Sequence, residues 1–105
     1  MAHLDTLPEI ATMADLIRAY PKTAQPAMAL AQAVLRGPSE LTEQQREFIF
    51  AFGSGLNACH YCHGAHTAAA EALGADAGLV AAAVADIEGV AIDARFKALL
   101  FSCAS

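Results

Sequence analysis

Two of the three cysteines and three of the four histidines lie within one short segment, Cys59-His60-Tyr61-Cys62-His63-Gly64-Ala65-His66. On a helix, Cys59, Cys62 and His66 project from one face, with His66 one turn beyond Cys62. The C-x-x-C spacing lets the two sulfurs bond, and a helix N-terminus favours the thiolate. Because an imidazole four residues further on can accept or return the thiol proton, the spacing predicts thiol redox chemistry.

Glu47 lies twelve positions before Cys59 and is the last charged residue before the apolar run Phe48–Phe52. A carboxylate there is expected to be partly buried and to need a partner. Antiparallel pairing of the two helices would place Glu47 against His66, where it would orient the ring and raise its basicity. A solvated carboxylate near a helix start is the alternative, although Glu43 fits that role better.

Three other interpretations of the cysteine segment are open. Zinc would take Cys59, Cys62 and His66 with Glu47 or His63, but structural zinc sites usually use two separated ligand pairs, and the chain has no second pair. Residues 59–63 also form C-x-x-C-H, the attachment pattern of c-type haem, which normally needs a secreted chain. In the third, both cysteines are inert and buried. We favour redox catalysis without a cofactor or metal, and keep a non-catalytic zinc-binding or interaction module as the alternative.

The outlying reactive residues receive structural interpretations. His3 is assigned to a frayed terminus and Cys103 to a packed, inert thiol. His63 borders the reactive face, where a solvated ring is favoured over a supporting role, and His60 is expected to point away from that face. Core packing is predicted for the remaining aromatic side chains of this region, Phe48, Phe50, Phe52 and Tyr61.

Composition predicts an all-α fold. The chain has 105 residues, of which 56% are hydrophobic and 16% charged. Alanine, the best helix former, is abundant, whereas β-branched and aromatic residues that favour strands are sparse. A chain of this length is expected to form one domain, over residues 1–105, as a compact bundle of about six short helices.

Charge and hydropathy exclude several partners. The net charge is −5, so a basic face for nucleic acid or an anionic membrane surface is not expected. No apolar run approaches the roughly 18 residues of a spanning helix. The first five residues, 1–5, do not resemble a signal peptide, which predicts a cytoplasmic, reducing compartment where the cysteines are free, metal-bound or catalytic.

The elements that must position these residues can be read from capping and apolar spacing. Short helices are predicted over Ile10–Ala19 and Pro26–Leu35, because the prolines punctuate this region. Thr42 and Gln45 match a capping box, so a third helix should begin near Glu43. Its apolar run is expected to be buried, and the glycines of 53–55 to weaken its end or admit another backbone.

Three further helices are predicted. The fourth should run from Ala58 to Leu73, with Asn57 as its N-cap and Gly74 in the left-handed conformation after it. Asp76 should cap a fifth helix over Ala77–Ala85, and Asp93 a sixth that continues to the chain end. The sixth has an apolar stripe and no stop signal, which predicts either burial against another subunit or a longer protein of which this is the front portion.

From Gly37 to Leu73 the sequence resembles the AhpD-like alkylhydroperoxidases of the carboxymuconolactone decarboxylase family. The family pattern is a Glu, eleven intervening residues, C-x-x-C, and a His four places after the second Cys. Glu47, Cys59, Cys62 and His66 meet this pattern. Four functional positions at fixed spacing make the resemblance specific.

The resemblance implies an all-helical fold that oligomerises and a thiol-dependent peroxidase or disulfide reductase. A thiolate would attack a peroxide, form a sulfenic acid and be resolved as a disulfide, with Glu47 and His66 as the proton relay. We assign Cys62 as the attacking thiol because His66 is one turn away, and Cys59 as the resolving thiol, although a helix N-terminus favours Cys59 as the thiolate. A thiol reductant or redox partner protein would complete the cycle. The decarboxylase branch generally lacks the cysteine pair, which argues against lactone decarboxylation.

Overall fold

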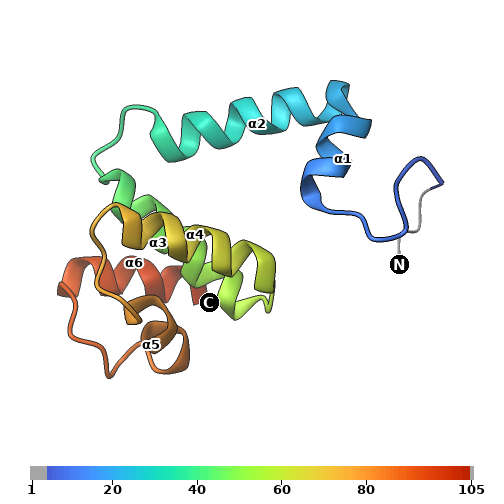
Figure 1. The fold of residues 1–105 in the computed structure, drawn as a ribbon. Coiled ribbons are helices and arrows are strands. Elements are labelled where there is room, and N and C mark those ends of the chain that lie inside the picture. The colour runs from blue at the N-terminus through green and yellow to red at the C-terminus, as the bar shows by residue number, and fades with distance from the viewer. Residues whose placement is uncertain (1–4, 105) are drawn as a thin grey trace. The chain divides into compact units, whose positions relative to one another are not determined.

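The computed structural model describes residues 5–104, which form six helices and no strand (Figure 1). The predicted all-α class is therefore confirmed. The helices are α1 (Met13–Ala19), α2 (Pro21–Arg36), α3 (Glu43–Leu56), α4 (His60–Ala72), α5 (Leu79–Ala85) and α6 (Ala94–Ala104). The chain divides into two compact units, Met1–Pro38 and Ser39–Ser105, which are described separately below. The interpretation of His3 lies outside the described residues.

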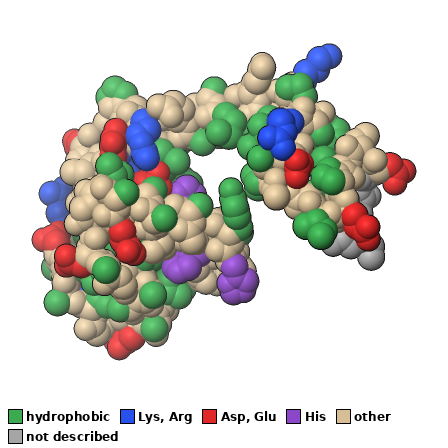
Figure 2. Space-filling model, in the orientation of Figure 1, with side chains coloured by type: hydrophobic (Ala, Val, Ile, Leu, Met, Phe, Trp, Pro, Cys, Tyr) green, Lys and Arg blue, Asp and Glu red, His purple; other side chains and the backbone are tan. Residues whose placement is uncertain are grey.

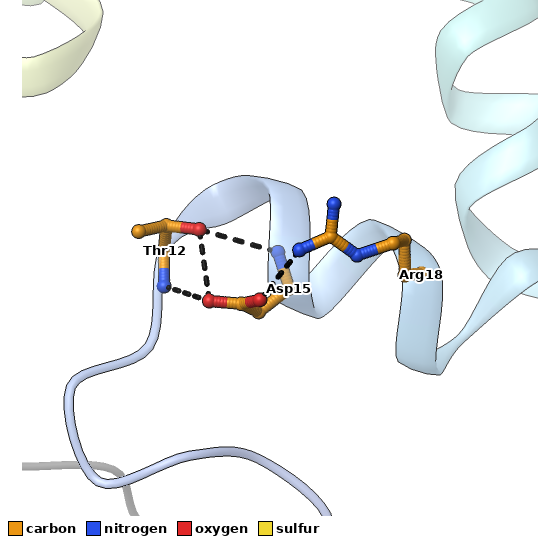
Figure 3. Close-up of polar contacts among 3 residues, drawn as sticks. All are labelled: Thr12, Asp15 and Arg18. Atoms are coloured by element: carbon orange, nitrogen blue, oxygen red, sulfur yellow. Dashed lines mark hydrogen bonds and ion pairs between the residues drawn. The ribbon is translucent and has the colours of Figure 1, made fainter.

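In the first unit, helix starts are set by local caps. Helix α1 begins at Met13 rather than at the predicted Ile10, because the Thr12 side chain accepts the Asp15 backbone N–H and the Asp15 carboxylate accepts the Thr12 N–H (Figure 3). This reciprocal pair is a capping box that the sequence prediction missed. None of the residues of α1 or α2 is buried.

Helix α2 begins five residues earlier than predicted. Pro21 occupies its first turn, where the missing N–H has no cost, and Tyr20 forms the corner with α1. Pro26, predicted as the start, lies inside the helix instead. Because proline has no N–H, the carbonyl of the exposed Lys22 loses its helical donor. The predicted start is wrong because Pro21 and Pro26 both suit a first helical turn, and the helix begins at the earlier one.

The second unit holds the core. Helix α3 starts at its predicted capping box, with Thr42 and Gln45 bonded reciprocally. Its buried face packs against α5 and α6, and the rings of Phe48 and Phe96 meet edge to face with centroids 5.4 Å apart. The fully packed cluster consists of Phe48, Ala51, Phe52, Val80, Ala83, Phe96 and Leu100. Helix α4 lies along α3 (Figure 1).

The corner between α3 and α4 differs from the prediction. Helix α3 continues through its glycines to Leu56, and Asn57 is its C-cap rather than the N-cap of α4. Ala58 follows in the left-handed conformation at φ 56°. Its N–H bonds to the Gly55 carbonyl, while the Cys59 N–H bonds to the Ser54 carbonyl. These two bonds form a Schellman motif, which places Cys59 at the N-cap of α4.

The later helix boundaries follow the predicted signals more closely. Gly74 has φ 108° after α4, as predicted. Helix α5 begins at Leu79 instead of Ala77, because Gly78 takes a left-handed conformation at its N-cap. Asp93 caps α6 by accepting the Phe96 N–H at 3.1 Å, as predicted. Among the described residues, no helix has both the length and the apolar character needed to cross a membrane.

Candidate functional site

Cys59 and Cys62 are joined in a disulfide, with their Cα atoms 5.4 Å apart. Cys59 is the N-cap of α4 and Cys62 lies in its first turn, so both sulfurs are at the positive end of the helix. The prediction that Cys59 lies inside the helix is therefore wrong. The predicted proximity of the two sulfurs is nevertheless present, because the corner turns Cys59 toward Cys62.

The buried Glu47 and the partly buried His66 form a pair between α3 and α4. Glu47 Oε2 lies 2.6 Å from His66 Nδ1, and the side chains are 4% and 26% exposed. A carboxylate only accepts hydrogen bonds, so Nδ1 donates and Nε2 is the nitrogen that can exchange a proton with a substrate. The structure thus brings Glu47 against His66 as the antiparallel pairing predicts, and the solvated alternative for Glu47 is wrong.

Phe50 contacts the same imidazole. The two ring centroids are 5.3 Å apart and the planes are tilted by 42°. Phe50 is 40% exposed, unlike Phe48 and Phe52 on the opposite side of α3. The prediction that all three phenylalanines are core residues is therefore wrong for Phe50, which forms an apolar wall beside His66. Tyr61, also predicted as core, is 67% exposed.

His63 was expected to be a solvated ring, and the structure corrects this. Its Nδ1 lies 2.8 Å from the carbonyl oxygen of Ala51, a fully buried residue of α3. The ring is partly buried. Gly55 lies one turn after Ala51 on α3, beside this ring, and is the sequence signal for the contact. The glycines of 53–55 predict a weakened helix end or the approach of another backbone, whereas side chains approach at Gly55.

The outlying candidates lie elsewhere. His60, expected to point away from the Cys59 face toward solvent or a neighbouring helix, is exposed, and histidine atoms reach the surface of the second unit in Figure 2. Cys103 is a free thiol and exposed, so its predicted packing is wrong. Among the described residues, no three His, Cys, Asp or Glu side chains are grouped so that they could hold a metal ion. The zinc alternative would also need Cys59 and Cys62 as separate thiolates, whereas here they are bonded.

One hollow of the second unit lies away from this site. It has a volume of about 630 Å³ and lies between the start of α3 and helix α6. Its lining residues are Glu40, Leu41, Gln45, Asp93, Arg95, Phe96, Ala98, Leu99 and Ser102. None of the four predicted site residues is among them, so the candidate chemistry belongs to the corner and first turns of α4 rather than to this hollow.

Comparison with protein families gives one match. The model of the carboxymuconolactone decarboxylase family matches residues 21–101. No curated protein and no solved structure matches the chain. The family match covers helices α2–α5 and most of α6, and it includes the disulfide and the Glu47–His66 pair. The chain therefore belongs to the carboxymuconolactone decarboxylase family.

Proposed function

We propose that this protein is a thiol-dependent peroxidase of the AhpD-like type, which reduces peroxides through Cys59 and Cys62. One observation carries the proposal. A cysteine pair that can close to a disulfide begins the same helix on which, one turn later, His66 is bonded to the buried Glu47. A redox-active pair beside an oriented imidazole supplies both the electrons and the proton that peroxide reduction needs.

The first proposed step starts from the reduced pair. The Cys62 thiolate attacks one peroxide oxygen, the O–O bond breaks, and Cys62 becomes a sulfenic acid. The other oxygen leaves as an alcohol, or as water from hydrogen peroxide, after it takes a proton from His66 Nε2. Glu47 accepts a hydrogen bond from Nδ1 and stabilises the charged ring before that transfer. Helix α4 favours the thiolate because Cys62 lies in its first turn.

The second proposed step closes the disulfide. The Cys59 sulfur attacks the Cys62 sulfenic acid, and water leaves. Two thiols and one peroxide therefore give one disulfide, one alcohol and one water. A thiol reductant or a redox partner protein then returns two electrons to the pair. The structure with the Cys59–Cys62 bond corresponds to the oxidised form of this cycle.

Two further expectations belong to the same proposal. A reducing, cytoplasmic compartment would supply the thiol reductant. Assembly into a homo-oligomer would cover apolar surface, since α6 leaves Leu99 42% and Phe101 41% exposed. Light scattering of the purified protein tests the assembly; a monomer at all concentrations would contradict it.

The test of the peroxidase proposal is a thiol count. A Cys103→Ser background removes the exposed third thiol, and the reduced protein is treated with hydrogen peroxide or an alkyl hydroperoxide. We expect two thiols before treatment, none after it, and a mass loss corresponding to one intramolecular disulfide. Cys62→Ser in that background keeps one thiol, Cys59, and we expect this thiol to persist after the same treatment.

Two outcomes decide against it. If both thiols persist after peroxide in folded protein, the proposed function is wrong. If Cys62→Ser still consumes peroxide at the unmutated rate while Cys59→Ser does not, the assigned order of the two cysteines is reversed.

A further inference from the structure

We propose that His63 is a positioning residue for the cysteine pair. Its imidazole fastens the first turn of α4 to α3 and thereby holds Cys59 within bonding reach of Cys62. The inference rests on the proposed redox role of the pair, but not on peroxide as the substrate. It follows from three features of the α3–α4 corner.

The first feature is strain directly before Cys59. Ala58 has φ 56°, a conformation that costs a residue with a Cβ about 1–2 kcal/mol. Such a conformation persists only where the surrounding structure holds it. The Schellman bonds hold it from the α3 side. Without a constraint from the α4 side, the corner could relax and carry Cys59 away from Cys62.

His63 supplies that second constraint. Its backbone N–H bonds to the Cys59 carbonyl at 2.9 Å, and its ring nitrogen Nδ1 lies 2.8 Å from the Ala51 carbonyl oxygen. A carbonyl only accepts, so Nδ1 donates. The residue is thus bonded to the N-cap of α4 through its backbone and to the body of α3 through its side chain. The two contacts span the strained Ala58.

Gly55 makes this reach possible. A methyl group at position 55 would lie 2.9 Å from His63 Nδ1 and 2.7 Å from Val84 Cγ2. Any other residue there would displace the imidazole from the α3 surface. In contrast, a methyl group at Gly53, two residues earlier on α3, would meet no atom within 4 Å. The close approach is therefore specific to the position beside His63.

The consequence concerns the dithiol–disulfide equilibrium. A constraint that is present in the reduced protein lowers the entropy lost when the sulfurs join, so it favours the disulfide. Removing one net hydrogen bond is expected to lower the equilibrium constant for disulfide formation about threefold to tenfold. A tenfold change corresponds to about 30 mV in the reduction potential of the pair, toward a more oxidising value.

The experiment measures this potential in dithiothreitol or glutathione buffers, in the Cys103→Ser background. His63→Leu keeps the bulk but removes the donor, and we expect the threefold to tenfold shift. His63→Asn places an amide N–H near the position of Nδ1 and should restore the equilibrium constant to within about twofold of the parent. A residue that only stabilises the fold would not show this rescue, because both redox forms are folded during the measurement.

Gly55→Ala and Gly53→Ala form the matched pair. Gly55→Ala keeps His63 but displaces its ring, so it should shift the potential in the same direction as His63→Leu, and the double variant should add little. Gly53→Ala should leave the potential unchanged. If His63→Leu does not fold, the glycine pair still decides the question.

An unchanged potential in folded His63→Leu, or in Gly55→Ala, overturns the inference, as does a failure of His63→Asn to restore it. The proposed function fails separately. If the wild-type cysteine pair equilibrates with dithiothreitol but does not react with peroxide, the peroxidase proposal is wrong. The reduction potentials of the His63 variants would still test the positioning role.

Discussion

Helices α1 and α2 differ from helices α3–α6 in how they are stabilised. Every buried apolar side chain of residues 5–104 comes from the second unit, whereas no residue of α1 or α2 is buried. Helix α1 instead relies on surface contacts, such as Arg18 Nη2 donating to Asp15 Oδ1 at 2.7 Å (Figure 3). Isolated short helices are marginal in water, so local caps alone cannot fix such a region firmly.

The contrast explains where the candidate site lies. Redox and proton-transfer chemistry needs groups held within a few tenths of an ångström, which packed helices achieve better than surface helices. Glu47 is on the buried face of α3, and the cysteine pair begins the helix that packs along it. The first unit holds none of the four proposed site residues.

The largest expected effect is on stability in the packed unit. Phe52 is 1% exposed, so Phe52→Ala should lower the free energy of unfolding by about 3–5 kcal/mol. Leu30 in α2 is 66% exposed, and Leu30→Ala should change the free energy of unfolding by no more than about 0.5 kcal/mol. Urea unfolding followed by circular dichroism measures both. Equal losses in the two variants would show that the units do not differ as described.

A second substitution should strengthen the weaker unit. Pro26 lies inside α2, where proline costs about 3 kcal/mol relative to alanine. Pro26→Ala should therefore stabilise α2 and increase amide protection across it, as measured by hydrogen exchange. Pro21→Ala is the control, because proline is well tolerated at a helix start. Reduced amide protection in Pro26→Ala would contradict this prediction and would indicate that Pro26 stabilises α2 through contacts outside the helix.

The carboxylates of Glu47 in α3 and Asp15 in α1 allow the two units to be compared in their effect on the peroxide reaction. Glu47→Gln removes the buried charge that orients His66, and should lower the rate of peroxide reaction about 100-fold. Asp15→Asn, the matched change in α1, should leave that rate unchanged. Stopped-flow measurement of thiol loss checks both. A Glu47→Gln rate within about twofold of the wild type would contradict the relay.

The smallest effect is a pH dependence of α1. The backbone N–H of Thr12, its hydroxyl and the Arg18 guanidinium hold the pKa of Asp15 below its ordinary value of 3.8. A carboxylate with a lowered pKa adds stability above its unfolded pKa, and this contribution is lost as the pH falls through the folded value. Nuclear magnetic resonance shifts of the Thr12 amide should therefore follow an acid titration whose midpoint lies below pH 3.8.

In Asp15→Asn this acid transition should be missing. A transition that is identical in the variant and the wild type would mean that another group titrates there. The partial exposure of Asp15 keeps the effect small.

Signals that act within one turn of the chain were predictable. The capping box at Thr42, the Asp93 cap of α6 and the left-handed Gly74 all follow from side chains a few residues away. The C-x-x-C spacing likewise predicted that the Cys59 and Cys62 sulfurs can bond. The start of α2 was missed because both Pro21 and Pro26 satisfy the same local rule.

By itself, the sequence determined the helical class, the caps at Thr42, Gly74 and Asp93, and the identity of the reactive residues, because these depend on composition and on neighbours along the chain. The tertiary structure decided which of them are buried. In the folded chain Glu47 is the partner of His66, and the His63 ring is bonded to the Ala51 carbonyl. Phe50 and Tyr61 are exposed. Burial and contacts between helices depend on how the faces of α3, α4 and α5 pack together, and no local pattern specifies that packing.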